Sequence, residues 1–284
     1  MSRWVPLSAV VLVLAAIRTA VPAAQAVPPA VDPLHRQYDQ LLDINVRDGQ
    51  VYYRALRSER ATLDRYVASL NVADATYAGW SKEARMAFWL NAYNAVVLQT
   101  VVNHYPIRGR AEGYPSSSIR QIPGAFEQAR RRLAGRAVTL DEIEKAILPE
   151  FKEPRLYLAL GRGALGSGRL RSEAYTASRL TAQLDAVQAE FVNEAAMLRI
   201  DRLTGRVSVT PIISWREAEF VAAYDKGADG PFGQRSPVER AILAFVAPHL
   251  LRLEREFVDR NEFGVVFHEF DWRLNDLSGG RGDQ

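Results

Sequence analysis

The chain contains no cysteine, and this absence excludes several kinds of chemistry. Without thiols the chain can form no disulfide bond, no thiolate metal site and no covalent intermediate on cysteine. A bacterial lipoprotein carries its lipid on a cysteine at the cleavage site, so lipid attachment by that route is excluded as well.

The chain also has little surplus of charge of either sign. Its net charge of +3 includes Arg3 and Arg18 near the start, and the remaining chain holds 34 basic and 33 acidic residues. A nucleic-acid-binding domain usually carries a clustered basic surplus, so this balance does not favour nucleic acid as a partner. Lysine is scarce, and the only ones are Lys82, Lys145, Lys152 and Lys226.

No apolar run is long enough to cross a bilayer, which takes about 20 residues. The apolar stretch Trp4–Ile17 ends at Arg18, and Ala24-Gln25-Ala26 follows as a small-residue cleavage signal. This order is typical of a secretory signal peptide. We therefore expect residues 1–26 to be removed and the mature protein, with no membrane span, to be periplasmic or extracellular. Cleavage after Ala23 and an uncleaved anchor are the alternatives.

Beyond the signal, hydrophobic spacing predicts an α+β fold: a single helix-rich domain with a small, mainly antiparallel sheet. We expect a linker over residues 27–37, one domain over 38–276 and a disordered glycine-rich tail over 277–284. The longest helix is predicted over residues 82–103 and is apolar on every side, which is typical of a buried helix. Trp89 and Tyr93 should therefore lie in the core.

Strands and helix caps complete the predicted layout. Period-two patterns predict strands over 155–160 and 265–270 and a hairpin over 198–202 and 206–210. Three capping boxes, each a Ser or Thr followed three residues later by Glu, predict helix starts. They pair Thr139 with Glu142, Ser214 with Glu217, and Ser236 with Glu239.

Residues Gly161–Gly166 match the G-x-G-x-x-G pattern of dinucleotide-binding loops. That pattern needs its third glycine at the start of a helix that holds the pyrophosphate. Here the next helix signal is only Thr176 or Ser178, so we do not expect a dinucleotide. No other motif indicates a cofactor or a metal.

Two asparagines and two histidines are further candidates. Asn91 and Asn94 lie three residues apart on one face of the apolar helix, where an unpaired buried amide costs about 1–3 kcal/mol. The favoured interpretation is that both amides bond to the backbone of neighbouring loops, and the alternative is that they line a cleft. His268 falls in the last predicted strand and is expected to be a core histidine, while His249 follows Pro248.

Several segments together carry a family resemblance. Phe88–Ala95 reads FWLNAYNA and Glu173–Thr176 reads EAYT, and shorter matches occur at Gly49–Tyr53, Val138–Leu148, Pro154–Leu160 and Asp271–Asn275. In this order, over roughly Tyr38 to Asp276, they resemble the domain-of-unknown-function family 547 in a bacterial, exported form.

The resemblance also implies where a site would lie. The family carries S-C-P-P-L before its E-A-Y-T segment, and Ser167 stands where that cysteine would be, while Lys145 and Tyr157 stand at two family histidines. Candidate catalytic residues are therefore Ser167 and His268. Candidate binding residues are those at the family's motifs or beside them: Asn91, Tyr93, Asn94, Lys145, Tyr157, Arg169 and Tyr175.

Two functional hypotheses follow. Serine without a positioned base is a poor nucleophile, which favours a non-catalytic or catalytically degenerate envelope domain that binds a small molecule or a protein partner. The alternative is a hydrolase with Ser167 as nucleophile and His268 or His249 as base. Because Gly166 and Gly168 are expected to loosen this loop, the favoured hypothesis predicts that Ser167→Ala is silent for stability and activity.

Overall fold

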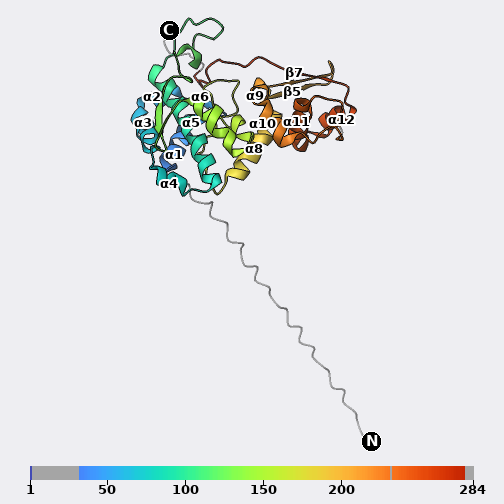
Figure 1. Cartoon of the computed structure of the whole chain (residues 1–284), viewed down its shortest axis with the longest axis horizontal. Coiled ribbons are helices and arrows are strands. Elements are labelled where there is room, and N and C mark those ends of the chain that lie inside the picture. Colours follow the sequence, from blue (N-terminus) through green and yellow to red (C-terminus); the bar gives the residue numbers. More distant parts are fainter. Residues whose placement is uncertain (2–31, 231, 279–284) are drawn as a thin grey trace. The chain divides into compact units, whose positions relative to one another are not determined.

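The computed structural model describes Met1, residues 32–230 and residues 232–278 (Figure 1). Most of the expected signal peptide, residues 27–31 of the expected linker and residues 279–284 of the expected tail lie outside these ranges. The described residues from Asp32 onward belong to one compact unit.

Helices dominate the first part of this unit. They are α1 (Arg36–Asn45), α2 (Tyr53–Ser58), α3 (Arg60–Ser69), α4 (Asp74–Ala78) and α5 (Lys82–His104). A hairpin of β1 (Val46–Arg47) and β2 (Gln50–Val51) separates α1 from α2. Asp48 and Gly49 both have positive φ at its turn, as a type I′ turn requires. Helix α1 begins inside the range expected for the linker, and His35 just before it is only 4% exposed.

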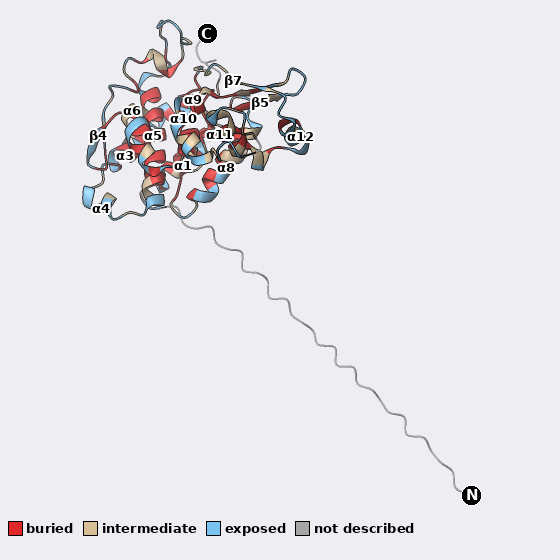
Figure 2. Ribbon diagram, turned by 45° about the vertical axis from the view of Figure 1, so that its right-hand side comes forward, coloured by how far each residue is buried: buried red, intermediate tan, exposed pale blue. Residues whose placement is uncertain are grey.

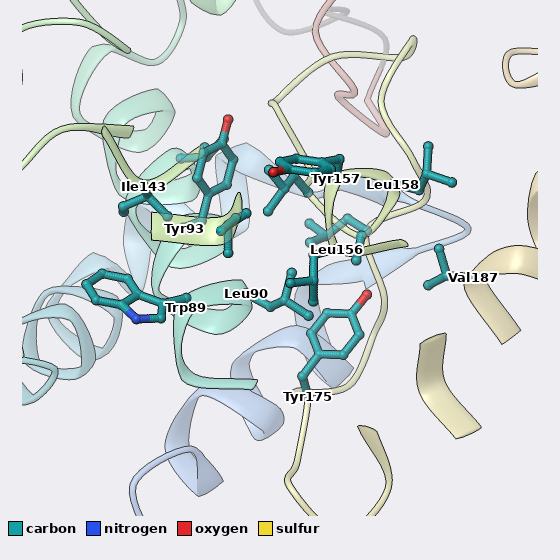
Figure 3. Packing of buried hydrophobic residues seen from close by; sticks show 14 of the residues in the cluster. Trp89, Leu90, Tyr93, Ile143, Leu156, Tyr157, Leu158, Tyr175 and Val187 are labelled. Carbon is teal, nitrogen blue, oxygen red and sulfur yellow. The ribbon is translucent and has the colours of Figure 1, made fainter. Parts of the chain in front are cut away.

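Helix α5 lies at the centre of the core, as its all-round apolar sequence predicts (Figure 2). Ser81 caps it by accepting a hydrogen bond from the Ala84 N–H. Trp89 and Tyr93 are fully buried. Figure 3 shows these two side chains in one cluster with Ile143 and Leu156, so α5 packs directly against the segment that forms the site described below.

That segment contains short elements: η1 (Ile119–Gln121), β3 (Arg131–Leu133), β4 (Arg136–Val138), α6 (Leu140–Glu142), the π-helical turn η2 (Ile143–Ile147) and the 3-10 turn η3 (Leu148–Phe151). The predicted capping box is confirmed: Thr139 and Glu142 exchange both hydrogen bonds at the start of α6.

The strand predicted over residues 155–160 is wrong. The chain forms a helical turn there, α7 (Arg155–Leu158), which begins directly after Pro154. The alternation of leucines was misleading because the intervening Tyr157 and Ala159 are each only 1% exposed. With both sets of side chains buried, the period-two pattern does not mark one face of a strand.

The remaining elements are α8 (Leu180–Asn193), β5 (Leu198–Asp201), β6 (Arg206–Val209), α9 (Pro211–Trp215), α10 (Glu217–Tyr224), α11 (Pro237–Val246), η4 (Ala247–His249), α12 (Arg252–Arg260) and β7 (Gly264–Phe267). The predicted hairpin is β5 and β6, which pair antiparallel with Leu198 opposite Val209. Strand β7 then pairs parallel to β6. The fold is therefore helix-rich α+β, as predicted, and β6–β7 is the one parallel pair among the described strands.

Of the two later capping boxes, the one at Ser236 is confirmed and the one at Ser214 is wrong. Thr210 caps α9 instead, with Pro211 as its first residue. Ser214 therefore lies inside the helix, where its hydroxyl donates to the Pro211 carbonyl. Within the described ranges, no helix combines the length and apolarity that a bilayer crossing requires.

Candidate functional site

A cavity of about 310 Å³ combines charged and aromatic side chains from distant parts of the sequence. We call it the arginine cavity. It is lined by Arg120, Phe126, Asp141, Glu144, Lys145, Arg162, Trp215, Arg216 and Trp272. Four cations and two carboxylates thus surround one space, together with three aromatic rings.

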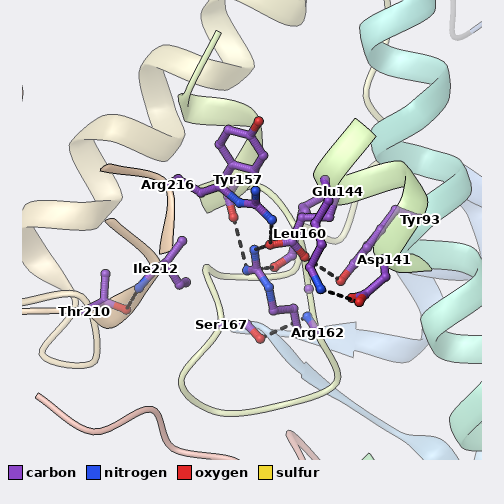
Figure 4. A network of polar contacts seen from close by, with 12 residues as sticks. Tyr93, Asp141, Glu144, Tyr157, Leu160, Arg162, Ser167, Thr210, Ile212 and Arg216 are labelled. Atoms are coloured by element: carbon purple, nitrogen blue, oxygen red, sulfur yellow. Dashed lines mark hydrogen bonds and ion pairs between the residues drawn. The ribbon is translucent and has the colours of Figure 1, made fainter. Parts of the chain in front are cut away.

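One part of the cavity lining is a carboxylate that two guanidiniums share (Figure 4). Glu144 Oε1 lies 2.8 Å from Arg162 Nη2 and 3.3 Å from Arg216 Nη2. Burial alone would raise the pKa of the Glu144 carboxyl, but the guanidiniums of Arg162 and Arg216 outweigh burial and hold the pKa below its ordinary value. Glu144 is therefore ionised at neutral pH and is not available as a general acid.

Two of the predicted binding residues, both tyrosines, contact this cluster of charged side chains, although neither lines the cavity itself. The Tyr93 hydroxyl donates to Glu144 Oε2 at 3.2 Å. The ring of Tyr157 lies under Arg216, whose guanidinium carbon is 4.9 Å from the ring centroid, and its hydroxyl donates to Glu219. Burial raises the pKa of both phenols above the ordinary value. Both remain protonated donors that position the charged side chains.

Aromatic rings form another wall of the arginine cavity. Trp215 and Trp272 are nearly parallel, with centroids 6.5 Å apart and an interplanar angle of 18°. Arg120 lies over Trp272 at 4.6 Å and over Phe126 at 4.4 Å, a cation–π arrangement. Trp215 is 43% exposed, so one large apolar surface remains open to solvent beside the cations.

Arg162 is held by the glycine-rich loop and by the residues just before it. The Arg162 side chain donates to the carbonyls of Tyr157 and Leu160, and the Arg162 backbone N–H donates to Ser167 Oγ at 2.9 Å. A Cβ on Gly168 would lie 1.6 Å from the Leu158 carbonyl oxygen. Glycine at this position therefore permits close contact between two stretches of backbone, a role that the sequence alone did not indicate.

Ser167 lines a different, smaller cavity of about 160 Å³, together with Arg169. Its hydroxyl accepts the Arg162 N–H, and among the described residues no hydrogen bond joins it to a histidine. Arg169 forms an ion pair with Asp48 at 3.0 Å. The serine that stands at the family's cysteine position is therefore hydrogen-bonded to backbone and is not paired with a base among the described residues.

The two histidines proposed as bases lie elsewhere. His268 follows β7 and places Nε2 3.0 Å from the Ala196 carbonyl oxygen, while its Nδ1 is buried without a hydrogen-bond partner. His249 lies in η4, half-buried beside α11. Neither is among the residues that line the arginine cavity or the cavity of Ser167.

The two asparagines of α5 hold loop backbone, which is the favoured interpretation of their pattern. Asn91 accepts from the Tyr175 N–H at 2.9 Å and donates to the Tyr175 carbonyl at 2.8 Å. Asn94 accepts from the Gly161 N–H at 2.8 Å and donates to the Ala159 carbonyl at 3.2 Å. Both are buried, as is Tyr175, whose hydroxyl has no hydrogen-bond partner among the described residues.

Of the predicted site residues, only Lys145 lines the arginine cavity directly, where it forms an ion pair with Asp141. Sequence reasoning missed Glu144, although one signal was present. Leu140, Ile143 and Ile147 are spaced as one helical face, and Glu144 falls on that same face. A charged residue on an apolar face requires a buried partner. Arg162, Arg216 and Trp272 gave no comparable local signal.

Comparison with known families supports the resemblance. The family model described as "Protein of unknown function, DUF547" matches residues 77–192. This range contains the N-x-Y-N segment of α5, Glu144 and Arg162, whereas Trp215, Arg216 and Trp272 lie beyond it. No curated protein and no solved structure matches the chain significantly.

Proposed function

The chain belongs, through residues 77–192, to the DUF547 family of proteins of unknown function, and we propose that it is an exported, non-catalytic domain that binds a small molecule in the arginine cavity. The observation that carries this proposal is the lining of the cavity. Exposed aromatic surface and several cations meet around a single concave space, and such convergence of apolar and polar groups is typical of ligand sites.

The alternative, hydrolysis by Ser167, has less support. A serine nucleophile needs a base within hydrogen-bonding distance, and the Ser167 hydroxyl instead accepts the Arg162 N–H. The negative charge of Glu144, the buried carboxylate near the same loop, is balanced by two guanidiniums. The Ser167 hydroxyl and the Glu144 carboxylate are therefore both engaged in contacts within the fold, and this does not favour a catalytic role for either.

A thermal-shift screen of the chain from Val27 onward against a small-molecule library tests the binding proposal. A ligand of the arginine cavity should raise the melting temperature of the wild type and have a much smaller effect on Trp272→Ala, because binding to the native state stabilises it. Leu253→Ala is the matched control, since Leu253 is 58% exposed and lies on α12. Ligands that stabilise Trp272→Ala as strongly as the wild type would place the site elsewhere.

A fluorophosphonate probe tests the alternative in the same preparation. We expect no labelling. Stoichiometric labelling that disappears in Ser167→Ala would support the hydrolase instead.

Export is tested separately by N-terminal sequencing of protein expressed with residues 1–26. Protein that begins at Val27 and is recovered from the periplasm or the medium is the expected result. An intact Met1 in the membrane fraction would contradict export.

A further inference from the structure

The cations of the arginine cavity differ in how far the fold already uses them. Arg162 is 2% exposed in its side chain and donates to two carbonyls as well as to Glu144. The guanidinium of Arg216 makes one hydrogen bond among the described residues, the 3.3 Å contact to Glu144, and its Nη1 lies 3.9 Å from Glu219. A guanidinium has five N–H donors, so Arg216 retains most of its capacity to donate.

The anionic side of the cavity is already occupied. Glu144 accepts from Arg162, Arg216 and Tyr93, so one carboxylate balances two guanidiniums. The other lining carboxylate, Asp141, is paired with Lys145, whose side chain is 61% exposed. Positive charge is therefore in excess within the lining. Arg120 forms an ion pair with Glu127 and lies over the rings of Phe126 and Trp272. Arg216 and Lys145 are the lining cations beside these two carboxylates that keep unused donors.

Resting on the proposed function, we infer that the ligand of the arginine cavity is an organic anion, a carboxylate or a phosphate monoester, that carries a flat apolar ring. The anion pairs with Arg216 and Lys145, because guanidinium and ammonium groups form their strongest hydrogen bonds with these groups. The ring lies against Trp215, the exposed member of the aromatic wall.

Isothermal titration of the chain from Val27 onward with four probes tests this inference. Benzoate and phenyl phosphate carry both parts of the ligand, benzyl alcohol carries the ring without the charge, and inorganic phosphate carries the charge without the ring. We expect benzoate or phenyl phosphate to bind more tightly than the other two, and the tighter of the pair to identify the anionic group. Higher salt should weaken that binding.

Two variants and a control locate the interaction. Arg216→Met should weaken binding of the ring-bearing anion about tenfold to a hundredfold, the range for one hydrogen bond to a charged group, and leave benzyl alcohol unchanged. Lys145→Gln should weaken it less, and because Lys145 is largely exposed the variant should fold. Arg252→Met, whose side chain is 90% exposed on α12, should have no effect.

Three results would overturn the inference. Benzyl alcohol that binds as tightly as benzoate would show that charge does not matter, and the binding function would stand with a different ligand class. Anion binding that neither Arg216→Met nor Lys145→Gln weakens would place the anion outside this cavity. Failure of all four probes, while a library compound stabilises the wild type but not Trp272→Ala, would refute the anionic class and leave the binding function intact.

Discussion

The buried ion pairs of Glu144 allow a sharp test of the site's energetics. Glu144→Gln removes the negative charge with almost no change in side-chain volume. It leaves Arg162, 2% exposed in its side chain, without an anionic partner. Breaking a buried ion pair from one side costs about 3–5 kcal/mol, because an uncompensated charge stays in a poorly solvated place. The free energy of unfolding should fall by about that amount.

Asp141→Asn is the matched control, since it lies only three residues away in the same helical segment. Its partner Lys145 is 61% exposed in its side chain, and the ion pair is therefore screened by water. An exposed pair contributes about 0–1 kcal/mol. The two variants make the same chemical change, a carboxylate to an amide, and differ mainly in the burial of the cation left behind.

Urea unfolding of the chain from Val27 onward measures the difference, provided that the slope of stability against urea is unchanged. A loss for Glu144→Gln no larger than that for Asp141→Asn would refute the reasoning. The dependence of stability on acidic pH gives a second test. The folded pKa of Glu144 lies below the ordinary 4.5, so its stabilisation is complete above pH 4.5 and is lost as the pH falls through the folded pKa. Glu144→Gln should remove that part of the acid dependence.

Three further predictions concern single side chains. Burial lowers the pKa of His35 from 6.5 to about 4 despite the opposing charge of Asp32, so stability should fall by about 3 kcal/mol between pH 6.5 and pH 4; a His35→Gln variant with the same pH dependence would contradict this. Trp89→Ala should cost about 3–5 kcal/mol in urea unfolding, and a midpoint equal to that of the wild type would show that α5 is peripheral. Ser167→Ala, expected from sequence to be silent, should instead cost about 1–3 kcal/mol, because the buried Arg162 N–H loses its acceptor; an unchanged urea midpoint would restore the earlier expectation.

Most of the fold could be predicted from local sequence patterns, namely hydrophobic spacing and helix caps. These patterns failed where burial in the folded protein did not follow the local pattern. The helix from Lys82 and the cap at Thr139 depend on neighbouring residues, and both were predicted correctly. The strand expected after Pro154 was not, because burial on all sides removes the contrast on which a period-two pattern depends.

The site was harder to predict because it joins distant segments. Arg162 and Arg216 both bind Glu144. Each is separated from it in the sequence by other elements, and the sequence alone does not show how those elements pack. Three predicted residues, Tyr93, Lys145 and Tyr157, do contact or line the arginine cavity. They were found through the family resemblance, whereas the charged centre required the folded arrangement.

The spacing of the two asparagines on α5 has a geometric consequence of its own. A helix rises 1.5 Å per residue, so Asn91 and Asn94 offer attachment points about 4.5 Å apart along the axis, close to the roughly 4.8 Å between neighbouring strands of a sheet. Each amide uses one N–H donor and its carbonyl acceptor, and each holds one loop by both. The spacing of the two asparagines on the helix thus fixes where each loop is held along the helix axis. Inserting a single residue between the asparagines would turn one amide by about 100° around the axis, and only one loop could then be held.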